Sequence, residues 1–145
     1  MSDADLIKLY SQRILALAAD MPGTEPLAAP DATFRKRAPL CGSTVEVAIT
    51  QRDGVVTGYS QSVHACALGQ ASAAIFGAAV VGCDHVQIAR LRDELAAMLK
   101  GGPVPQAPFG EYEVLTAARE YPNRHGSILL APDATLAALQ SLGVH

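Results

Sequence analysis

A predicted β-hairpin with one cysteine beyond each of its ends is the feature that most constrains the fold of this chain. Residues Thr44–Gln51 alternate between apolar and polar, Asp53-Gly54 is a two-residue turn signal, and Val55–Val63 is expected to be the second strand. Cys41 precedes the first strand and Cys66 follows the second. Because the turn reverses the chain, both cysteines are expected at one end of a small sheet.

The hairpin needs further structure to cover it. Its second strand keeps Val55, Tyr59 and Val63 on one face, but Gly58, Ser60 and Ser62 weaken the alternation and predict an edge strand or a bulge. A two-stranded ribbon is marginal alone, so a third strand or a helix layer must bury its face, and no clear third strand is visible. We expect one α+β domain spanning residues 1–145, with a small antiparallel sheet (about 44–63) covered on one face by several helices.

Helices are predicted before and after the hairpin. Apolar spacings of three and four indicate a first helix over Asp3–Ala19, with the stripe Leu6, Ile7, Tyr10, Ile14, Leu17 and Ala18. The small-residue segment Cys66–Ala79 is expected to be a buried helix. Asp84 can cap the next helix, whose stripe is Ile88, Leu91, Leu95 and Met98. Asp133 is expected to cap a terminal helix that continues to Leu142.

The remaining segments are predicted to be mostly irregular. Met21–Pro39 has no apolar period and is expected to be a long loop, with Arg35-Lys36-Arg37 solvated on it or forming a docking patch for a protein partner. Pro103–Gly110 is expected to be an exposed connection, and Glu113–Glu120 a turn or two of helix.

Charge and composition exclude several classes of function. The net charge is -3, and the basic cluster at residues 35–37 is too short for a nucleic-acid footprint. The N-terminus is acidic and no apolar run reaches the ~18 residues of a membrane span, so we expect a cytoplasmic protein without membrane contact. Three cysteines are an odd number, which favours free thiols over disulfides. The chain has no phosphate-binding glycine loop and no paired carboxylates.

Cys41 and Cys66 are the residues that predict chemistry. Cys66 opens a predicted helix, where free N–H groups and the positive end of the helix dipole favour the thiolate form, although a cysteine among alanines can also be a small buried hydrophobe. Cys41 precedes Gly42, whose missing side chain allows the backbone to approach a bound metal. Soft thiolates select zinc or iron–sulfur clusters over hard cations.

His125 is the best candidate for a third ligand, because it lies in a polar turn led by Pro122 and imidazole suits both zinc and iron. His64 is a second candidate, since in an extended segment it shares a side with Cys66, but a surface histidine is the simpler interpretation. We expect the other histidines and the third cysteine to be solvated or packed: His85, His145 and Cys83. A cysteine-nucleophile hydrolase is the alternative use of Cys66, but no local nucleophile signature accompanies it.

Four segments together carry a family resemblance. They are Leu9-Tyr10, Pro39-Leu40-Cys41-Gly42, Cys66 with the following Ala71-Ser72-Ala73, and Arg124-His125-Gly126-Ser127-Ile128-Leu129. With these segments the chain resembles, over most of its length, the U-type iron–sulfur cluster assembly scaffolds, the family of IscU, SufU and the N-terminal domain of NifU. The extended stretch from Gly101 to Tyr121 is more similar to the SufU branch, and the Leu-Pro-Pro-Val-Lys chaperone motif of IscU is absent.

The resemblance implies an IscU/SufU-like fold and a cytoplasmic protein that binds zinc or a nascent iron–sulfur cluster, with [2Fe–2S] favoured. It implies a cysteine desulfurase and apo-acceptor proteins as partners, and a monomer or weak dimer. Cys41 and Cys66 match two of the three cysteine ligands of the family, and either can be the persulfide acceptor. The family's aspartate ligand corresponds to Ser43, and its third cysteine to Gly126, or to Ser127 if no gap is placed.

Three functions are compatible with these residues. The first is a scaffold that binds metal or a transient cluster through Cys41, Cys66 and His125. The second is a sulfurtransferase-like acceptor that takes persulfide from a desulfurase on Cys66 or Cys41, with zinc organising the thiolates. The third is a diverged paralogue that holds no metal and acts through protein interactions, which the replacements at Ser43 and Gly126 motivate.

Overall fold

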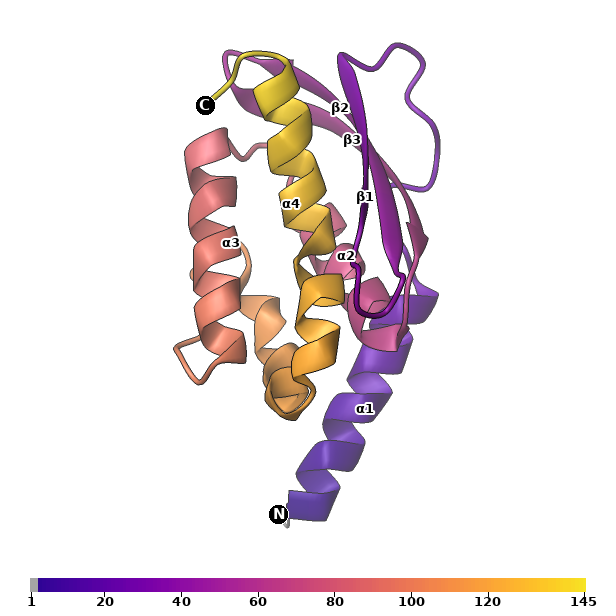
Figure 1. Cartoon of the computed structure of the whole chain (residues 1–145), viewed down its shortest axis with the longest axis vertical. Coiled ribbons are helices and arrows are strands. Elements are labelled where there is room, and N and C mark those ends of the chain that lie inside the picture. Colours follow the sequence, from indigo (N-terminus) through magenta and orange to yellow (C-terminus); the bar gives the residue numbers. More distant parts are fainter. Residues whose placement is uncertain (1–2) are drawn as a thin grey trace.

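One antiparallel sheet carries a layer of helices on one face (Figure 1). The computed structural model describes residues 3–145, with the side chains of residues 11–145. In chain order the elements, with η for a 3-10 helix, are α1 (Asp3–Ala19), β1 (Ala32–Arg37), β2 (Thr44–Arg52), β3 (Val55–His64), α2 (Ala67–Ala79), α3 (His85–Leu99), η1 (Gly110–Glu120), η2 (Pro122–Arg124) and α4 (His125–Ser141). Helices α2 and α4 pack on the sheet, α3 packs on α4, and α1 packs on α2 and η1 with its N-terminal end extending beyond this body. The described chain contains no helix long and apolar enough to cross a membrane.

The sheet confirms the predicted hairpin. Its strands pair antiparallel in the order β1-β2-β3, so β3 is an edge strand. The turn has positive φ at both Asp53 (54°) and Gly54 (82°), as a type I′ turn requires. A register shift between Thr50 and Gln51 is the irregularity that the sequence suggested. The inward-facing residues of β2 are fully buried against the helices: Val45, Val47 and Ile49.

Strand β1 is a correction to the expected loop over Met21–Pro39. Ala32–Arg37 pairs in full register with β2, from Ala32 opposite Ile49 to Arg37 opposite Thr44. Every residue of β1 after Ala32 is exposed. The strand therefore lacks the alternation of buried and exposed residues from which a strand can be predicted. Its pairing with β2, rather than its own apolar pattern, makes it a strand, and the charges at Arg35, Lys36 and Arg37 are typical of a protected sheet edge.

The helices near the middle of the chain are as predicted. Asp84 caps α3 in a reciprocal capping box: its carboxylate accepts a hydrogen bond from the Gln87 amide at 2.8 Å, and the Gln87 side chain accepts one from the Asp84 amide at 2.9 Å. The predicted stripe of α3 is entirely buried. In α1, Ile14 is buried, while the side chains of Leu6, Ile7 and Tyr10 lie outside the described residues.

The last helix starts earlier than the sequence suggested, and the capping role expected for Asp133 is wrong. Helix α4 begins at His125, and Asp133 lies within it, where its carboxylate accepts a hydrogen bond from Arg92 Nε at 2.9 Å. Pro132, in the middle of α4, has no N–H to donate to the carbonyl of Ile128. A hydroxyl from another helix supplies the missing donor, so the helix continues through the proline.

That donor is Ser72 of α2, which joins three elements in one buried group. Its hydroxyl donates to the Ile128 carbonyl of α4 and lies 3.0 Å from the hydroxyl of Tyr112 in η1. The Tyr112 hydroxyl also donates to the Ser72 carbonyl at 3.0 Å. Burial raises the pKa of Tyr112, so the phenol keeps its proton and remains a donor. Ser72 and Tyr112 are almost fully buried, so these bonds are shielded from water.

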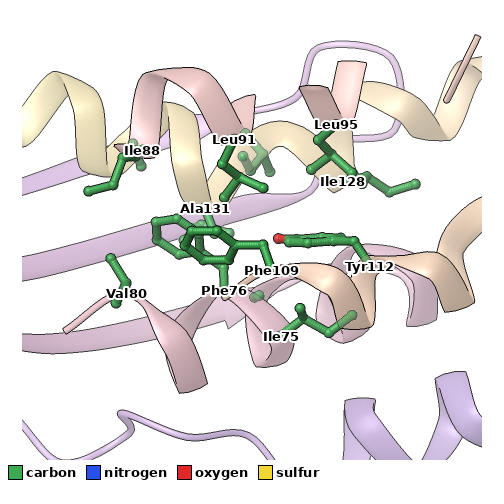
Figure 2. Close-up of a cluster of buried hydrophobic side chains, with 14 of the residues drawn as sticks. Ile75, Phe76, Val80, Ile88, Leu91, Leu95, Phe109, Tyr112, Ile128 and Ala131 are labelled. Atoms are coloured by element: carbon green, nitrogen blue, oxygen red, sulfur yellow. The ribbon is translucent and has the colours of Figure 1, made fainter. Parts of the chain in front are cut away.

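Apolar side chains surround this group (Figure 2). Phe76 of α2 stacks on Phe109, with ring centroids 5.9 Å apart, and forms a T-shaped pair with Tyr59 of β3, with centroids 5.7 Å apart. Phe109 is only 2% exposed, which corrects the expectation that Pro103–Gly110 is an exposed connection throughout. The segment after it forms the 3-10 helix η1, which contains the turn or two of helix expected over Glu113–Glu120. The core therefore fixes how α2, α4 and η1 meet.

We expect Ser72→Ala to lower the free energy of unfolding by about 1–2 kcal/mol, because it leaves the Ile128 carbonyl without a donor inside the core. Urea denaturation followed by circular dichroism measures this loss. Ser62→Ala, at an exposed serine of β3, is the matched control and should change stability by less than about 0.5 kcal/mol. Equal midpoints for both variants would contradict the role given to Ser72.

Candidate functional site

Three segments far apart in the sequence converge at one end of the molecule. They are the loop 38–43 between β1 and β2, the N-terminus of α2 at Cys66, and the N-terminus of α4. Each brings one or two small polar or thiol side chains: Cys41 and Ser43 from the loop, Cys66 from α2, and Ser127 from the first turn of α4. The site is therefore assembled by the packing of the two helices beside the hairpin.

The four side chains form one continuous row of contacts. Cys41 Sγ lies 3.2 Å from Ser43 Oγ, the Ser127 hydroxyl donates to Ser43 Oγ at 3.0 Å, and Cys66 Sγ lies 3.8 Å from Ser127 Oγ. The two serines are buried, at 4% and 1% exposed, whereas both thiols are partly exposed. The arrangement is a pair of accessible thiols linked through two buried hydroxyls.

The loop that carries Cys41 is held in one shape by its backbone. The Ala38 amide donates to the Ser43 carbonyl at 2.8 Å, and the Gly42 amide donates back to the Ala38 carbonyl at 2.9 Å. Gly42 has φ of 71°, a left-handed conformation that favours glycine. The loop therefore makes a tight turn at Gly42, which sets Cys41 and Ser43 on the same side of the loop.

A glycine also brings the two helices together at the site. A Cβ atom added at Gly69 of α2 would lie 2.2 Å from Ser127 Oγ and 2.9 Å from Ala65 Cβ, closer than atoms can approach. Any side chain at Gly69 would displace Ser127. The close approach of α2 and α4, stabilised by Ser72 one turn further along, is what puts the Ser127 hydroxyl next to Cys66.

The electrostatic setting of Cys41 favours its thiolate. The hydrogen bond from the Ser43 hydroxyl lowers the pKa of the Cys41 thiol, with smaller contributions from the Ser43 backbone, the Ser127 hydroxyl and the positive charge of Arg124, against an opposing effect of burial. The N-termini of α2 and α4 add two positive dipole ends on the same side. In contrast, burial and the neighbouring Asp84 raise the pKa of the Cys83 thiol, which packs with its Sγ toward the Ala79 carbonyl as predicted.

The predicted histidine ligands lie at the edge of this row rather than in it. His125 is the first residue of α4, and its Nε2 lies 2.8 Å from the Ala118 carbonyl oxygen. Nδ1 is the ring nitrogen that does not contact this carbonyl. His64 ends β3 and is exposed. Across the described residues, no three His, Cys, Asp or Glu side chains lie close enough together to hold a metal ion. The role of His125 as third ligand stays a prediction.

Two other histidine expectations have different outcomes. His145 is exposed, as expected. The expectation that His85 is solvated needs correction, because its Nδ1 is buried and has no hydrogen-bond partner among the described residues. His85 lies beside Gly54 at the hairpin turn, away from the thiols, and takes no part in the site.

Comparison with solved structures places this geometry in a known family. The N-terminal part of a nitrogen-fixing NifU-like protein from Brucella abortus superposes with a TM-score of 0.90 and 39% sequence identity over 98% of each chain. This chain belongs to the U-type, NifU-like family. The family predicted from the four sequence segments is confirmed, and so is the α+β fold expected for it.

More distant U-type folds agree. A protein from Fervidobacterium islandicum AW-1, described as an iron–sulfur cluster assembly scaffold for the SUF system, has a TM-score of 0.81 at 17% identity over 91% of this chain and 97% of its own. A hypothetical protein has a TM-score of 0.81 at 22% identity over 92% and 98%. At such identities the likeness shows the fold alone. No family model and no curated protein matches the chain.

The structure also distinguishes the two positions that the U-type resemblance left open for its third cysteine. Ser127 contacts Ser43 and Cys66 directly, whereas a Cβ at Gly126 would meet only Ala38, at 3.7 Å. In the sequence, Ser127 corresponded to the third cysteine of the family only if the comparison was made without a gap. No pattern in the sequence predicted its contact with Ser43. The two hydroxyls thus stand together where the resemblance implies an aspartate and a thiolate.

We expect Ser43→Ala to raise the pKa of the Cys41 thiol, because the largest stabilising contact of the thiolate is lost. Thiolate is the reactive form, so the rise of the alkylation rate with pH should move to higher pH in the variant. Iodoacetamide labelling at a series of pH values, with peptide mapping of Cys41, measures the shift. Ser62→Ala is the control, and an unchanged profile in Ser43→Ala would show that the hydroxyl does not stabilise the thiolate.

Proposed function

We propose that this chain is an iron–sulfur cluster assembly scaffold that carries a transient cluster on Cys41 and Cys66. The observation that carries the proposal is the pair of accessible thiols, linked through buried hydroxyls beside the N-termini of α2 and α4, in a U-type fold. Thiolates are the usual protein ligands of iron–sulfur clusters, and positive helix ends favour an anionic cargo.

The two thiols and two hydroxyls of the site suit a transiently bound cluster better than a permanent metal ion. Structural zinc sites are closed by four Cys or His ligands, whereas this site has two thiols and two neutral hydroxyls, which do not fit such a site. A cluster bound with few protein ligands is held weakly and is available for transfer. The small [2Fe–2S] type is the cluster we propose, with apo-acceptor proteins as its recipients.

We expect anaerobic incubation with iron and sulfide to give visible charge-transfer absorption and bound iron, and Cys41→Ala or Cys66→Ala to lose most of both. Cys83→Ala is the matched control, because Cys83 is buried away from the site and should leave iron content unchanged. His125→Ala, measured alongside, decides whether the imidazole contributes. A wild-type protein without absorption, or with iron that survives Cys41→Ala, would contradict the proposal.

Persulfide acceptance is the second candidate function, favoured by the lowered pKa of Cys41. A cysteine desulfurase would be the sulfur donor. The Cys41 thiolate attacks the outer sulfur of the donor persulfide, the donor S–S bond breaks, the donor cysteine leaves as its thiolate, and a Cys41 persulfide forms without any external oxidant. The Ser43 hydroxyl lowers the pKa of the Cys41 thiol and so favours the thiolate form of the attacking sulfur.

We expect a desulfurase charged with cysteine to transfer sulfur to Cys41, detected by mass spectrometry as one added sulfur atom on the peptide that contains it. Ser43→Ala should slow the transfer at neutral pH and recover at higher pH, since thiolate is then restored. Unlabelled Cys41, with desulfurase turnover unchanged by the protein, would reject this function. If elemental analysis also finds no metal on the purified protein and none binds on reconstitution, the non-metal paralogue remains.

A further inference from the structure

We infer that β1 is a docking edge for an acidic, extended segment of another protein, which adds to the sheet as a fourth strand next to the thiols. The cluster of Arg35, Lys36 and Arg37, which by its sequence is either solvated or a docking patch, lies on this strand. The inference concerns a partner and not the cargo, so it can be tested independently of the proposed scaffold function.

The backbone of β1 has unpaired groups along its outer edge. The strand ends one side of the sheet and pairs with β2 alone. The Ala38 amide donates to the carbonyl of Ser43, and these two residues continue the register of the strand pair. In an antiparallel ladder, the backbone groups of every second residue therefore point toward β2, and those of the others point away. The residues that point away are Thr33, Arg35 and Arg37. No described residue outside β2 forms a backbone hydrogen bond with them.

The edge of β1 is uncovered, in contrast to the opposite edge of the sheet. Edge strands are commonly protected by prolines, bulges or a covering loop. The loop after α1 covers β3 in this way, because the Gln61 amide donates to the Gly23 carbonyl at 2.7 Å and Gln61 Nε2 donates to the Pro22 carbonyl at 3.1 Å. Strand β1 pairs in uninterrupted register from Ala32 to Arg37 and is exposed after its first residue. Its protection is charge, and charge excludes only strands of the same sign.

The charges of β1 favour an acidic partner. Arg35, Lys36 and Arg37 follow one another, and none of them forms an ion pair with a described side chain. Arg35 lies opposite Glu46 in the register, yet these side chains do not come within ion-pairing distance. Arg35 and Arg37 share the sheet face away from the helices, so acidic residues at alternate positions of an added strand would lie beside both.

The other face of β1 adds an apolar contact. Phe34 lies opposite Val47, on the helix side of the sheet, and is 38% exposed. An apolar side chain on the corresponding face of an added strand would cover this ring. Main-chain hydrogen bonds give affinity in strand addition, and side chains at alternate positions give specificity. The pattern that fits β1 is therefore an alternation of acidic and apolar residues.

Arg37 connects this edge to the thiols. Strand β1 leads directly into the loop that carries Cys41, and Arg37 Nη2 lies 3.6 Å from the position that a Cβ atom of Gly42 would take. A segment bound along β1 therefore ends beside Cys41. The edge would hold a partner at the place where the site receives or releases its cargo.

The test uses a synthetic peptide of alternating glutamate and valine, about eight residues long to match one strand, added to the isotope-labelled full chain. We expect the amide signals of Thr33, Arg35 and Arg37 to shift in NMR spectra and their hydrogens to exchange more slowly, because these N–H groups donate to the added strand. A peptide with lysine in place of glutamate should not bind. A peptide of alternating glutamate and proline should bind about tenfold more weakly, because half of its backbone donors are missing.

Charge reversal on β1 gives the second measurement. Arg35→Glu with Arg37→Glu should weaken binding of the glutamate–valine peptide by about tenfold or more, because attraction is replaced by repulsion. Arg13→Glu with Arg52→Glu is the matched control, since it changes the net charge equally at exposed positions of α1 and of the far end of β2. The control should keep the affinity within about twofold of the wild type.

Several results would overturn the inference. They are the absence of binding with peptide in large excess, binding that leaves the three outward amides of β1 unprotected, and binding that survives reversal of both arginines. Binding of a short RNA oligonucleotide in place of the peptide would also overturn it. None of these results bears on cluster loading by Cys41 and Cys66, which the iron and absorption measurements decide separately.

Discussion

A serine hydroxyl that replaces a missing backbone donor is the interaction on which the arrangement of this molecule depends. Pro132 cannot donate to the Ile128 carbonyl, and the Ser72 hydroxyl donates instead, while Tyr112 bonds to the same serine. A buried carbonyl without a donor is costly, so α4 is stable next to α2 and η1 and less stable apart from them. The proline thus makes α4 dependent on its neighbour.

The geometry of the candidate site depends on the same contact between α2 and α4. The same packing brings α2 and α4 so close that only glycine fits at position 69, and it places Ser127 within 3.8 Å of Cys66. The loop that carries Cys41 and Ser43 then completes the row from the sheet side. The four side chains of the row come from three different elements, and the core beneath them fixes how these elements meet.

Local patterns in the sequence predicted the parts of the fold that have local causes. The hairpin, the Asp84 cap and the stripe of α3 each follow from residues a few positions apart, and all are confirmed. Strand β1 and the start of α4 could not be predicted in that way, because one depends on pairing with β2 and the other on a donor from α2. In the site, the hairpin indicated that the two thiols lie at the same end of the sheet, but the contact between Ser43 and Ser127 depends on helix packing, which no spacing in the sequence reveals.

The outer edge of the sheet limits how copies of this chain can associate. Strand β1 has one edge paired with β2, and Arg35, Lys36 and Arg37 follow one another along it, all exposed. A second strand added there would bring like charges into register, which disfavours growth of the sheet from one molecule to the next. Pairing of two molecules through this edge is thereby disfavoured, and chains that meet while partly unfolded are discouraged from extending the sheet into fibres.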